Sequence, residues 1–136
     1  MKADLSIAVL GAGSWGTALT IRLARNCYPT LLWGRDPGQI REMGVERLNR
    51  RYLPDTEFPE RLIPEADFAR ALEGVAAVLV AVPSHGYREL LERLASRIPP
   101  RLPVFWASKG LESGSRKFLH RNTEEELGTE HPTGVV

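Results

Sequence analysis

Three glycines fall within the segment GAGSWG at residues 11–16. In a phosphate-binding turn with this spacing, the first glycine permits the tight turn, and the second lets a phosphate approach the backbone. The third lets the following helix lie close to the preceding strand. Gly11, Gly13 and Gly16 are therefore candidates for these three positions. The alternative is a glycine-rich turn without a ligand.

The context of the glycines favours a dinucleotide site. A continuous apolar run from Leu5 to Leu10 precedes them and is typical of a buried strand, and the apolar spacing after them predicts a helix from about Ser14 to Asn26. A helix N-terminus directs N–H groups and partial positive charge at bound phosphates. We therefore expect the backbone N–H groups of Ser14 and Trp15 to donate to the pyrophosphate of NAD or NADP.

Arg35 and Asp36 follow a second predicted strand, Thr30 to Trp33. An acidic residue at this place usually accepts from the ribose hydroxyls of NAD, whereas an arginine can hold the extra phosphate of NADP. Asp36 precedes Pro37, a pattern typical of a helix N-cap, which would leave Arg35 facing the nucleotide. This pattern favours NADP and leaves NAD open.

Two further polar segments follow apolar runs. Pro83, Ser84 and His85 follow the strongest predicted strand, and Lys109 follows another. His85 is either a reacting group or a cap for a helix starting near Gly86, and capping is the simpler interpretation. Lys109 offers a point charge to an anionic substrate or phosphate, or else it is a solvated loop lysine.

Predicted strands alternate with predicted helices along the whole chain. Because the strands are apolar throughout, they indicate a parallel sheet that is covered on both faces. The fold class is therefore α/β, a doubly wound (Rossmann-type) parallel sheet with helices on both faces. Further strands are predicted near Leu62 and at Val75–Val82, Pro103–Ala107 and Thr133–Val136. Helices are predicted after Pro37 and at about Glu65–Glu73, Tyr87–Ile98 and Arg116–Leu127, and the helix after Pro37 is expected to direct Ile40, Met43 and Leu48 inward. The rest of Tyr52–Pro64 is predicted to be loop.

The composition is that of one ordinary globular domain of 136 residues. Eighteen basic and 17 acidic side chains give a net charge of +1, so we expect neither nucleic acid nor a membrane as partner. The single cysteine, Cys27, excludes an internal disulfide framework, and no signal peptide or metal site is indicated. These features predict a cytoplasmic protein.

Several segments together resemble one known family, the bacterial-type NAD(P)-dependent glycerol-3-phosphate dehydrogenases. The resemblance implies reversible reduction of dihydroxyacetone phosphate to sn-glycerol 3-phosphate, which feeds glycerophospholipid synthesis. It rests on the segments VLGAGSWGTAL (9–19), LWGRD (32–36), RYLP (51–54), VAVPSH (80–85) and ASKGLE (107–112).

The resemblance also suggests roles for individual residues. Ser14, Trp15 and Arg35 look like NADPH contacts, and Lys109 resembles a family lysine that touches both cofactor and substrate. Tyr52 and Pro83 are expected near the cofactor.

Family members continue with an all-helical domain that supplies the catalytic lysine. This chain ends at Val136, inside a predicted strand. We therefore expect a fragment without a catalytic residue that binds nucleotide but turns over little substrate, and a homodimer is compatible with the full-length protein. The alternatives are another Rossmann-type dehydrogenase of hydroxy acids, keto acids or sugar nucleotides, and a non-catalytic dinucleotide-sensing module.

Overall fold

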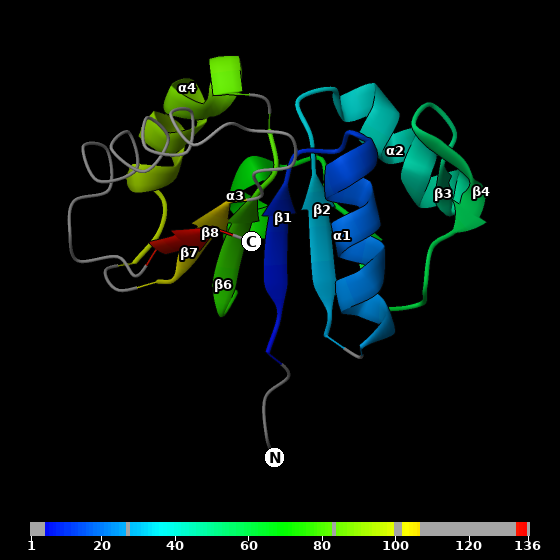
Figure 1. The fold of residues 1–136 in the computed structure, drawn as a ribbon, viewed down its shortest axis with the longest axis horizontal. Coiled ribbons are helices and arrows are strands. Elements are labelled where there is room, and N and C mark those ends of the chain that lie inside the picture. Colours follow the sequence, from blue (N-terminus) through cyan, green and yellow to red (C-terminus); the bar gives the residue numbers. More distant parts are fainter. Residues whose placement is uncertain (1–4, 27, 83, 100–101, 107–132, 136) are drawn as a thin grey trace.

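The computed structural model describes residues 5–26, 28–82, 84–99, 102–106 and 133–135. Strands and helices alternate along these ranges, with one hairpin inserted in the first half (Figure 1). The strands are β1 (Ile7–Leu10), β2 (Thr30–Trp33), β3 (Leu48–Asn49), β4 (Leu53–Glu57), β5 (Leu62–Pro64), β6 (Ala77–Val80), β7 (Val104–Trp106) and β8 (Thr133–Val135); the helices are α1 (Ser14–Arg25), α2 (Pro37–Glu46), α3 (Phe68–Leu72) and α4 (Ser84–Ala95).

Six parallel strands form the main sheet in the order β5-β2-β1-β6-β7-β8. The chain starts in the middle with β1, continues outward through β2 and β5, and then returns to pair β6 on the other side of β1 (Figure 1). The strand order therefore reverses between β1 and β6. In doubly wound sheets, ligands bind at the carboxyl ends of the strands at such a switch point. The predicted fold class is confirmed.

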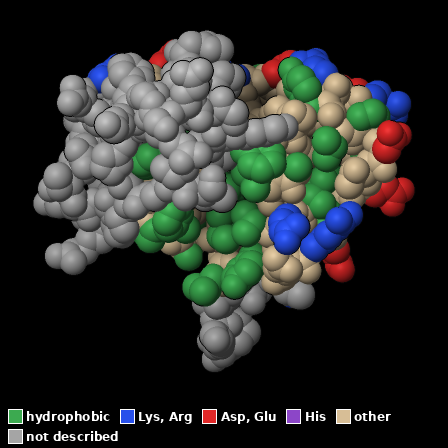
Figure 2. Space-filling model, viewed as in Figure 1, with side chains coloured by type: hydrophobic (Ala, Val, Ile, Leu, Met, Phe, Trp, Pro, Cys, Tyr) green, Lys and Arg blue, Asp and Glu red, His purple; other side chains and the backbone are tan. Residues whose placement is uncertain are grey.

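The two faces of the sheet carry separate hydrophobic clusters, so the strands are buried on both sides. Ala8 and Leu10 of β1 belong to a cluster with α3 and α4, whereas Val9 belongs to a cluster with α1 and α2. This explains the continuous apolar run in β1. Figure 2 shows hydrophobic side chains gathered in the middle of the viewed face. Ala81 and Phe105, which pack against the second cluster, are half-buried.

An aromatic cluster fixes the carboxyl end of β2 against α3 and α4. The rings of Trp33 and Phe68 meet edge to face at 4.9 Å, and the guanidinium of Arg93 lies 4.4 Å from the Phe68 ring centroid. The indole N–H of Trp33 donates to the Ala66 carbonyl at 3.2 Å. This packing holds the strand end from which Arg35 and Asp36 follow.

The antiparallel hairpin of β3 and β4 contradicts part of the sequence prediction. Residues 52–64 were expected to be loop apart from a strand near Leu62; β5 confirms that strand, but β4 also lies in the segment. Leu48 was expected on the inward face of the preceding helix, but α2 ends at Glu46. Arg47 then adopts the left-handed conformation, with φ at 59°, and turns the chain into β3. Ile40 and Met43 are buried as predicted.

Other differences concern the ends of elements. The Val75–Val82 prediction is too long, because β6 covers only Ala77–Val80 after a turn at Gly74, whose φ is 68°. On α4, Leu90, Leu91 and Leu94 are buried, whereas Ala95 is exposed. The predicted helix at 116–127 and Cys27 lie outside the described residues. Within those residues, no helix has the length and apolar character needed to cross a membrane.

Candidate functional site

The glycine turn lies at the switch point of the sheet, between the end of β1 and the start of α1. Gly11 adopts φ of +128°, a conformation that other residues rarely take, and its N–H donates to the Trp33 carbonyl at 2.7 Å. A Cβ at this position would lie 2.5 Å from the Ala81 carbonyl oxygen. The prediction that Gly11 permits a tight turn is confirmed.

Gly16 and Gly13 differ in what surrounds them. A Cβ on Gly16 would overlap the Gly11 carbonyl oxygen and lie 3.3 Å from the Ala81 side chain, so the helix can approach the strands only with glycine here. A Cβ on Gly13 would meet no atom of the described residues within 4 Å. The side of the turn at Gly13 is therefore open, as the approach of a phosphate to the backbone requires.

The N-terminus of α1 has the features of an anion site. Gly13 is the N-cap and provides no side-chain acceptor, and the first turn of α1 carries no acidic residue. Ser14 is exposed and Trp15 is half-buried at the start of this twelve-residue helix. Partial positive charge at the helix start thus meets no carboxylate from α1 itself. Binding by Ser14 and Trp15 remains a prediction.

Asp36 is engaged through both of its carboxylate oxygens. Its Oδ1 accepts from the N–H groups of Gly38 at 3.0 Å and Gln39 at 3.2 Å, so Asp36 caps α2 as predicted. Its Oδ2 lies 3.7 Å from a guanidinium nitrogen of Arg51, which extends from the turn between β3 and β4. These contacts hold the carboxylate against the start of α2 and beside Arg51.

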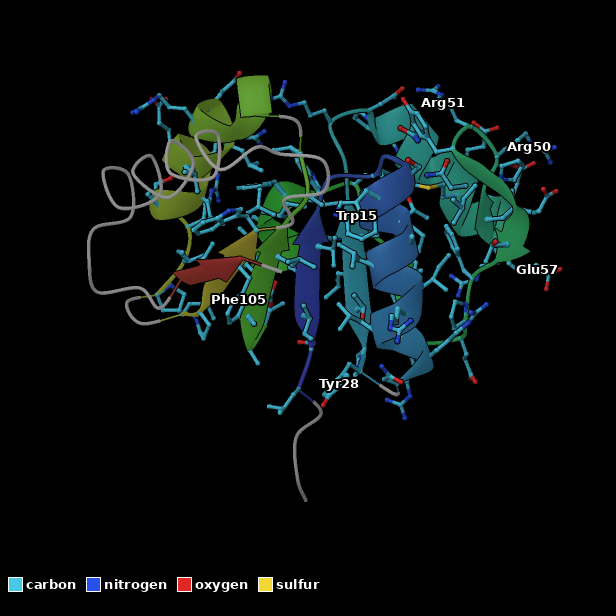
Figure 3. All side chains as sticks on the ribbon, viewed as in Figure 1. Trp15, Tyr28, Arg50, Arg51, Glu57 and Phe105 are labelled. Atoms are coloured by element: carbon cyan, nitrogen blue, oxygen red, sulfur yellow. The ribbon has the colours of Figure 1, made fainter. Side chains whose placement is uncertain are left out.

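Arg35 lies beside this cap at the carboxyl end of β2. Its side chain is 53% exposed, and its guanidinium lies 3.6 Å from a carboxylate oxygen of Glu89 on α4. The Arg35–Glu89 pair joins the loop after β2 to the helix after β6, on the two sides of the switch point. Figure 3 shows Arg51 near the carboxyl end of β2, with Tyr28 at the opposite end of the sheet.

Sequence reasoning missed Asn49, which is fully buried beside the glycine turn. Its Nδ2 donates to the Ala12 carbonyl at 3.0 Å and to the Thr17 hydroxyl at 2.8 Å. Its Oδ1 accepts from the Tyr52 backbone N–H at 3.2 Å. The only signal in the sequence was that an asparagine precedes the RYLP segment. The residues that Asn49 contacts come from parts of the chain that are far apart in sequence.

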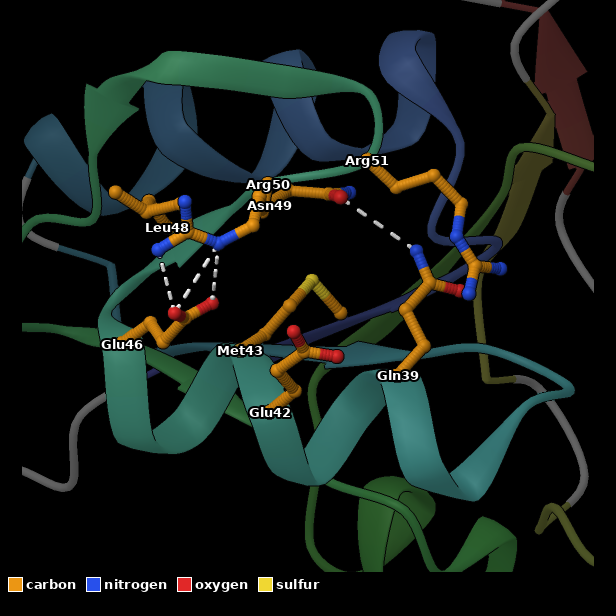
Figure 4. Close-up of a pocket in the computed structure, with 8 residues that line it drawn as sticks. All are labelled: Gln39, Glu42, Met43, Glu46, Leu48, Asn49, Arg50 and Arg51. Atoms are coloured by element: carbon orange, nitrogen blue, oxygen red, sulfur yellow. Dashed lines mark hydrogen bonds and ion pairs between the residues drawn. The ribbon is translucent and has the colours of Figure 1, made fainter.

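A hollow of about 250 Å³ lies between α2 and the β3–β4 hairpin (Figure 4). On its rim, the hydrogen bond from Arg50 lowers the pKa of the Glu46 carboxyl, and the same contact raises the pKa of Arg50. The hollow is lined by Gln39, Glu42, Met43, Glu46, Leu48, Asn49, Arg50 and Arg51. Tyr52 follows these residues in the chain and is 47% exposed. Its contact with a cofactor remains a prediction.

The remaining candidates are only partly covered by the structure. Pro83 and Lys109 lie outside the described residues. The helix α4 begins at Ser84, so Ser84 and His85 stand in its first turn rather than before a helix starting near Gly86. The capping interpretation of these two residues was therefore wrong. Within the described ranges, no group of three or more His, Cys, Asp and Glu side chains is placed to hold a metal ion.

The chain is similar to proteins of one family over nearly its whole length. The family model for the N-terminus of NAD-dependent glycerol-3-phosphate dehydrogenase matches residues 6–136. Glycerol-3-phosphate dehydrogenase [NAD(P)+] from Nitrosococcus oceani is 50% identical over 135 residues, which cover 99% of this chain and 39% of that protein. The enzyme of the same name from Mannheimia succiniciproducens is 44% identical and is likewise covered over 39% of its length. The chain thus spans about two fifths of these relatives.

Solved structures agree with this match. The crystal structure of glycerol-3-phosphate dehydrogenase from Coxiella burnetii superposes with a TM-score of 0.88 at 42% identity, covering 97% of this chain and 40% of that one. The glycerol-3-phosphate dehydrogenase of baker's yeast shares the fold, with a TM-score of 0.77 at 20% identity. The chain therefore belongs to the family of NAD-dependent glycerol-3-phosphate dehydrogenases and corresponds to their N-terminal domain.

Proposed function

We propose that residues 1–136 form the dinucleotide-binding domain of a glycerol-3-phosphate dehydrogenase and that the glycine turn binds the pyrophosphate of NADPH or NADH. The observation that carries the proposal is the open side of Gly13 at the start of α1, at the point where the strand order reverses. A diphosphate resting there would meet backbone N–H groups and the positive end of the helix. The names of the relatives support the same cofactor class.

The cofactor, when bound, supplies the hydride for interconverting dihydroxyacetone phosphate and sn-glycerol 3-phosphate. The chain's own residues bind and orient the dinucleotide. Ser14 and Trp15 are proposed to donate backbone N–H groups, and Lys109 to contact both cofactor and substrate. We assign the role of catalytic proton donor to none of the residues of this chain. The alternatives of a different dehydrogenase or a sensing module have no support in the family match.

The surroundings of Arg35 favour NADPH over NADH. Asp36 already accepts two backbone N–H groups, so a ribose hydroxyl would have to share its carboxylate with the start of α2. Arg35 is half-exposed and forms a surface ion pair with Glu89, a kind of contact that a 2′-phosphate can displace. A doubly charged phosphate is a stronger partner for a guanidinium than an exposed carboxylate.

Replacing Arg35 with alanine is expected to weaken NADPH binding selectively. Loss of a hydrogen bond to a charged group costs about 1.5–3 kcal/mol, so the Kd for NADPH should rise about 10- to 150-fold. The Kd for NADH should stay within about twofold. Titration of both cofactors, followed by fluorescence or calorimetry, measures this difference. Arg41→Ala, which removes an exposed guanidinium from α2, is the matched control; equal losses for both cofactors would remove the phosphate role.

The 136-residue chain is expected to bind dinucleotide without measurable turnover. Hydride transfer needs a proton donor and a complete substrate pocket, and we assign neither to these residues. NADPH consumption with dihydroxyacetone phosphate, measured by absorbance at high chain concentration, checks the expectation. Steady oxidation proportional to the amount of chain would contradict it.

The proposal also includes the cellular location of the protein and its oligomeric state. The single cysteine and the near-neutral charge support a cytoplasmic protein that binds neither nucleic acid nor membranes. A role in glycerophospholipid synthesis follows from the proposed reaction. A homodimeric full-length protein is proposed on the resemblance alone.

A further inference from the structure

The starting point is a buried amide that joins four parts of the chain. Asn49 of β3 is fully buried and donates both hydrogens of its amide, one to the Ala12 carbonyl and one to the Thr17 hydroxyl. Its oxygen accepts from the Tyr52 N–H at 3.2 Å and from the side-chain amide of Gln39 at 3.5 Å (Figure 4). The side chain therefore uses its full hydrogen-bonding capacity.

These partners permit only one orientation of the Asn49 amide. Rotation of the amide by 180° would place its oxygen against the Ala12 carbonyl oxygen and its N–H groups against the Tyr52 N–H. Both contacts would be repulsive, and the buried groups would lose their partners. The Ala12 carbonyl is thus fixed in direction by a donor that is itself fixed from the other side.

The direction of that carbonyl sets the direction of the next N–H group. In a trans peptide the C=O and N–H point to opposite sides of the chain, and the described residues contain no cis bonds. Because the Ala12 carbonyl faces the buried Asn49, the Gly13 N–H faces away from it. The bond to Thr17 ties the first turn of α1 to the same amide. The glycine turn therefore owes its orientation partly to a residue 37 positions further along the chain.

We propose that Asn49 is a positioning residue for the cofactor: it holds the glycine turn so that the N–H groups at the start of α1 face the pyrophosphate. The inference rests on the proposed function, because it assigns Asn49 a part in the same site. It also gives the β3–β4 hairpin a role, since the hairpin carries Asn49 to the turn and presents Tyr52 and Arg51 beside it.

The test compares Asn49→Leu with the wild-type chain. Leucine has nearly the same shape and removes all the hydrogen bonds of the amide. The Kd values for NADH and NADPH should both rise at least about tenfold and by the same factor, because both cofactors carry the pyrophosphate. Adenosine 2′-monophosphate has a 2′-phosphate and no pyrophosphate, so its Kd should stay within about twofold. Arg35→Ala should show the reverse pattern, with a loss for the monophosphate and for NADPH only.

Thr30→Val separates positioning from general destabilisation. Thr30 is also fully buried, and its hydroxyl donates to the Tyr28 carbonyl at 2.7 Å, at the amino end of β2 and away from the turn. Its loss should lower the free energy of unfolding without changing any of the three Kd values. Thr17→Val is the milder variant if Asn49→Leu does not fold, since it removes only one partner of the amide; it should weaken both dinucleotides equally, by about two- to fivefold.

The possible results distinguish the two proposals. If the wild-type chain binds neither dinucleotide, the proposed function fails. If the wild type binds both, but the folded Asn49 or Thr17 variants bind them as well as the wild type, only the positioning role fails. It also fails if Asn49→Leu weakens adenosine 2′-monophosphate as much as the dinucleotides, or if Thr30→Val causes the same losses.

Discussion

Replacing Gly13 with alanine is expected to abolish most dinucleotide binding while leaving the stability of the fold nearly unchanged. A Cβ at this position meets no atom within 4 Å in the part of the chain that the structure describes, and the backbone φ of −78° suits alanine. Alanine restricts the unfolded chain, which stabilises by about 0.4–1 kcal/mol, but it is a poorer N-cap than glycine by a similar amount, so the free energy of unfolding should change by less than about 1 kcal/mol. In the complex, the added methyl group would occupy the space through which the pyrophosphate reaches the N–H groups of α1.

The expected size of the loss follows from the contacts that the methyl group blocks. Two hydrogen bonds to a charged group are worth about 1.5–3 kcal/mol each, so the Kd of both cofactors should rise on the order of a hundredfold or more. Gly44→Ala is a matched control, because a Cβ there also meets none of the described atoms within 4 Å and the residue lies in α2. Titration and urea unfolding of both variants separate binding from stability. Normal binding by Gly13→Ala would overturn the proposed phosphate site.

Replacing Gly16 with alanine is expected to damage the fold itself. The added Cβ would overlap the Gly11 carbonyl oxygen and crowd the Ala81 side chain, and a backbone atom cannot turn aside as a flexible side chain can. The start of α1 must then move away from β1 and β6. Overpacking of this kind costs about 1–3 kcal/mol, and the backbone contact places Gly16 at the upper end of that range.

Urea unfolding followed by circular dichroism measures this destabilisation. The midpoint should shift to lower urea, and cofactor binding should be lost at the same time because the helix start moves. The Gly44→Ala variant again provides the comparison, with stability equal to or above wild type. If the Gly16→Ala chain has the same urea midpoint as the wild type, α1 does not approach β1 and β6 as closely as the contacts around Gly16 require.

The parts of the fold that the sequence predicted well depend on short-range chemistry. The glycine spacing identified the turn between β1 and α1, and the Asp36-Pro37 pair identified the start and cap of α2. Thr30–Trp33 was predicted with its observed bounds. In each case the deciding residues lie within a few positions of one another, so local preferences and the tertiary fold agree.

The β3–β4 hairpin could not be predicted because its stabilising contacts are remote in sequence. β4 contains Pro54 and charged residues and shows no alternation of apolar side chains, and Pro54 is tolerated because β4 lies in a two-stranded sheet. The hairpin is held by contacts such as the bond from the Arg47 guanidinium to the Pro59 carbonyl. Asn49 was missed for the same reason, since its partners Ala12 and Thr17 belong to the first strand–helix unit.

The double engagement of Asp36 limits how cofactor preference can evolve or be engineered in this chain. In many dinucleotide-binding sheets, the acidic residue after the second strand can be exchanged to alter the choice between NAD and NADP. Here the same carboxylate begins a helix, and losing an N-cap costs about 1 kcal/mol. A change of preference is therefore open mainly through Arg35 and its partner Glu89, where substitutions leave the helix start intact.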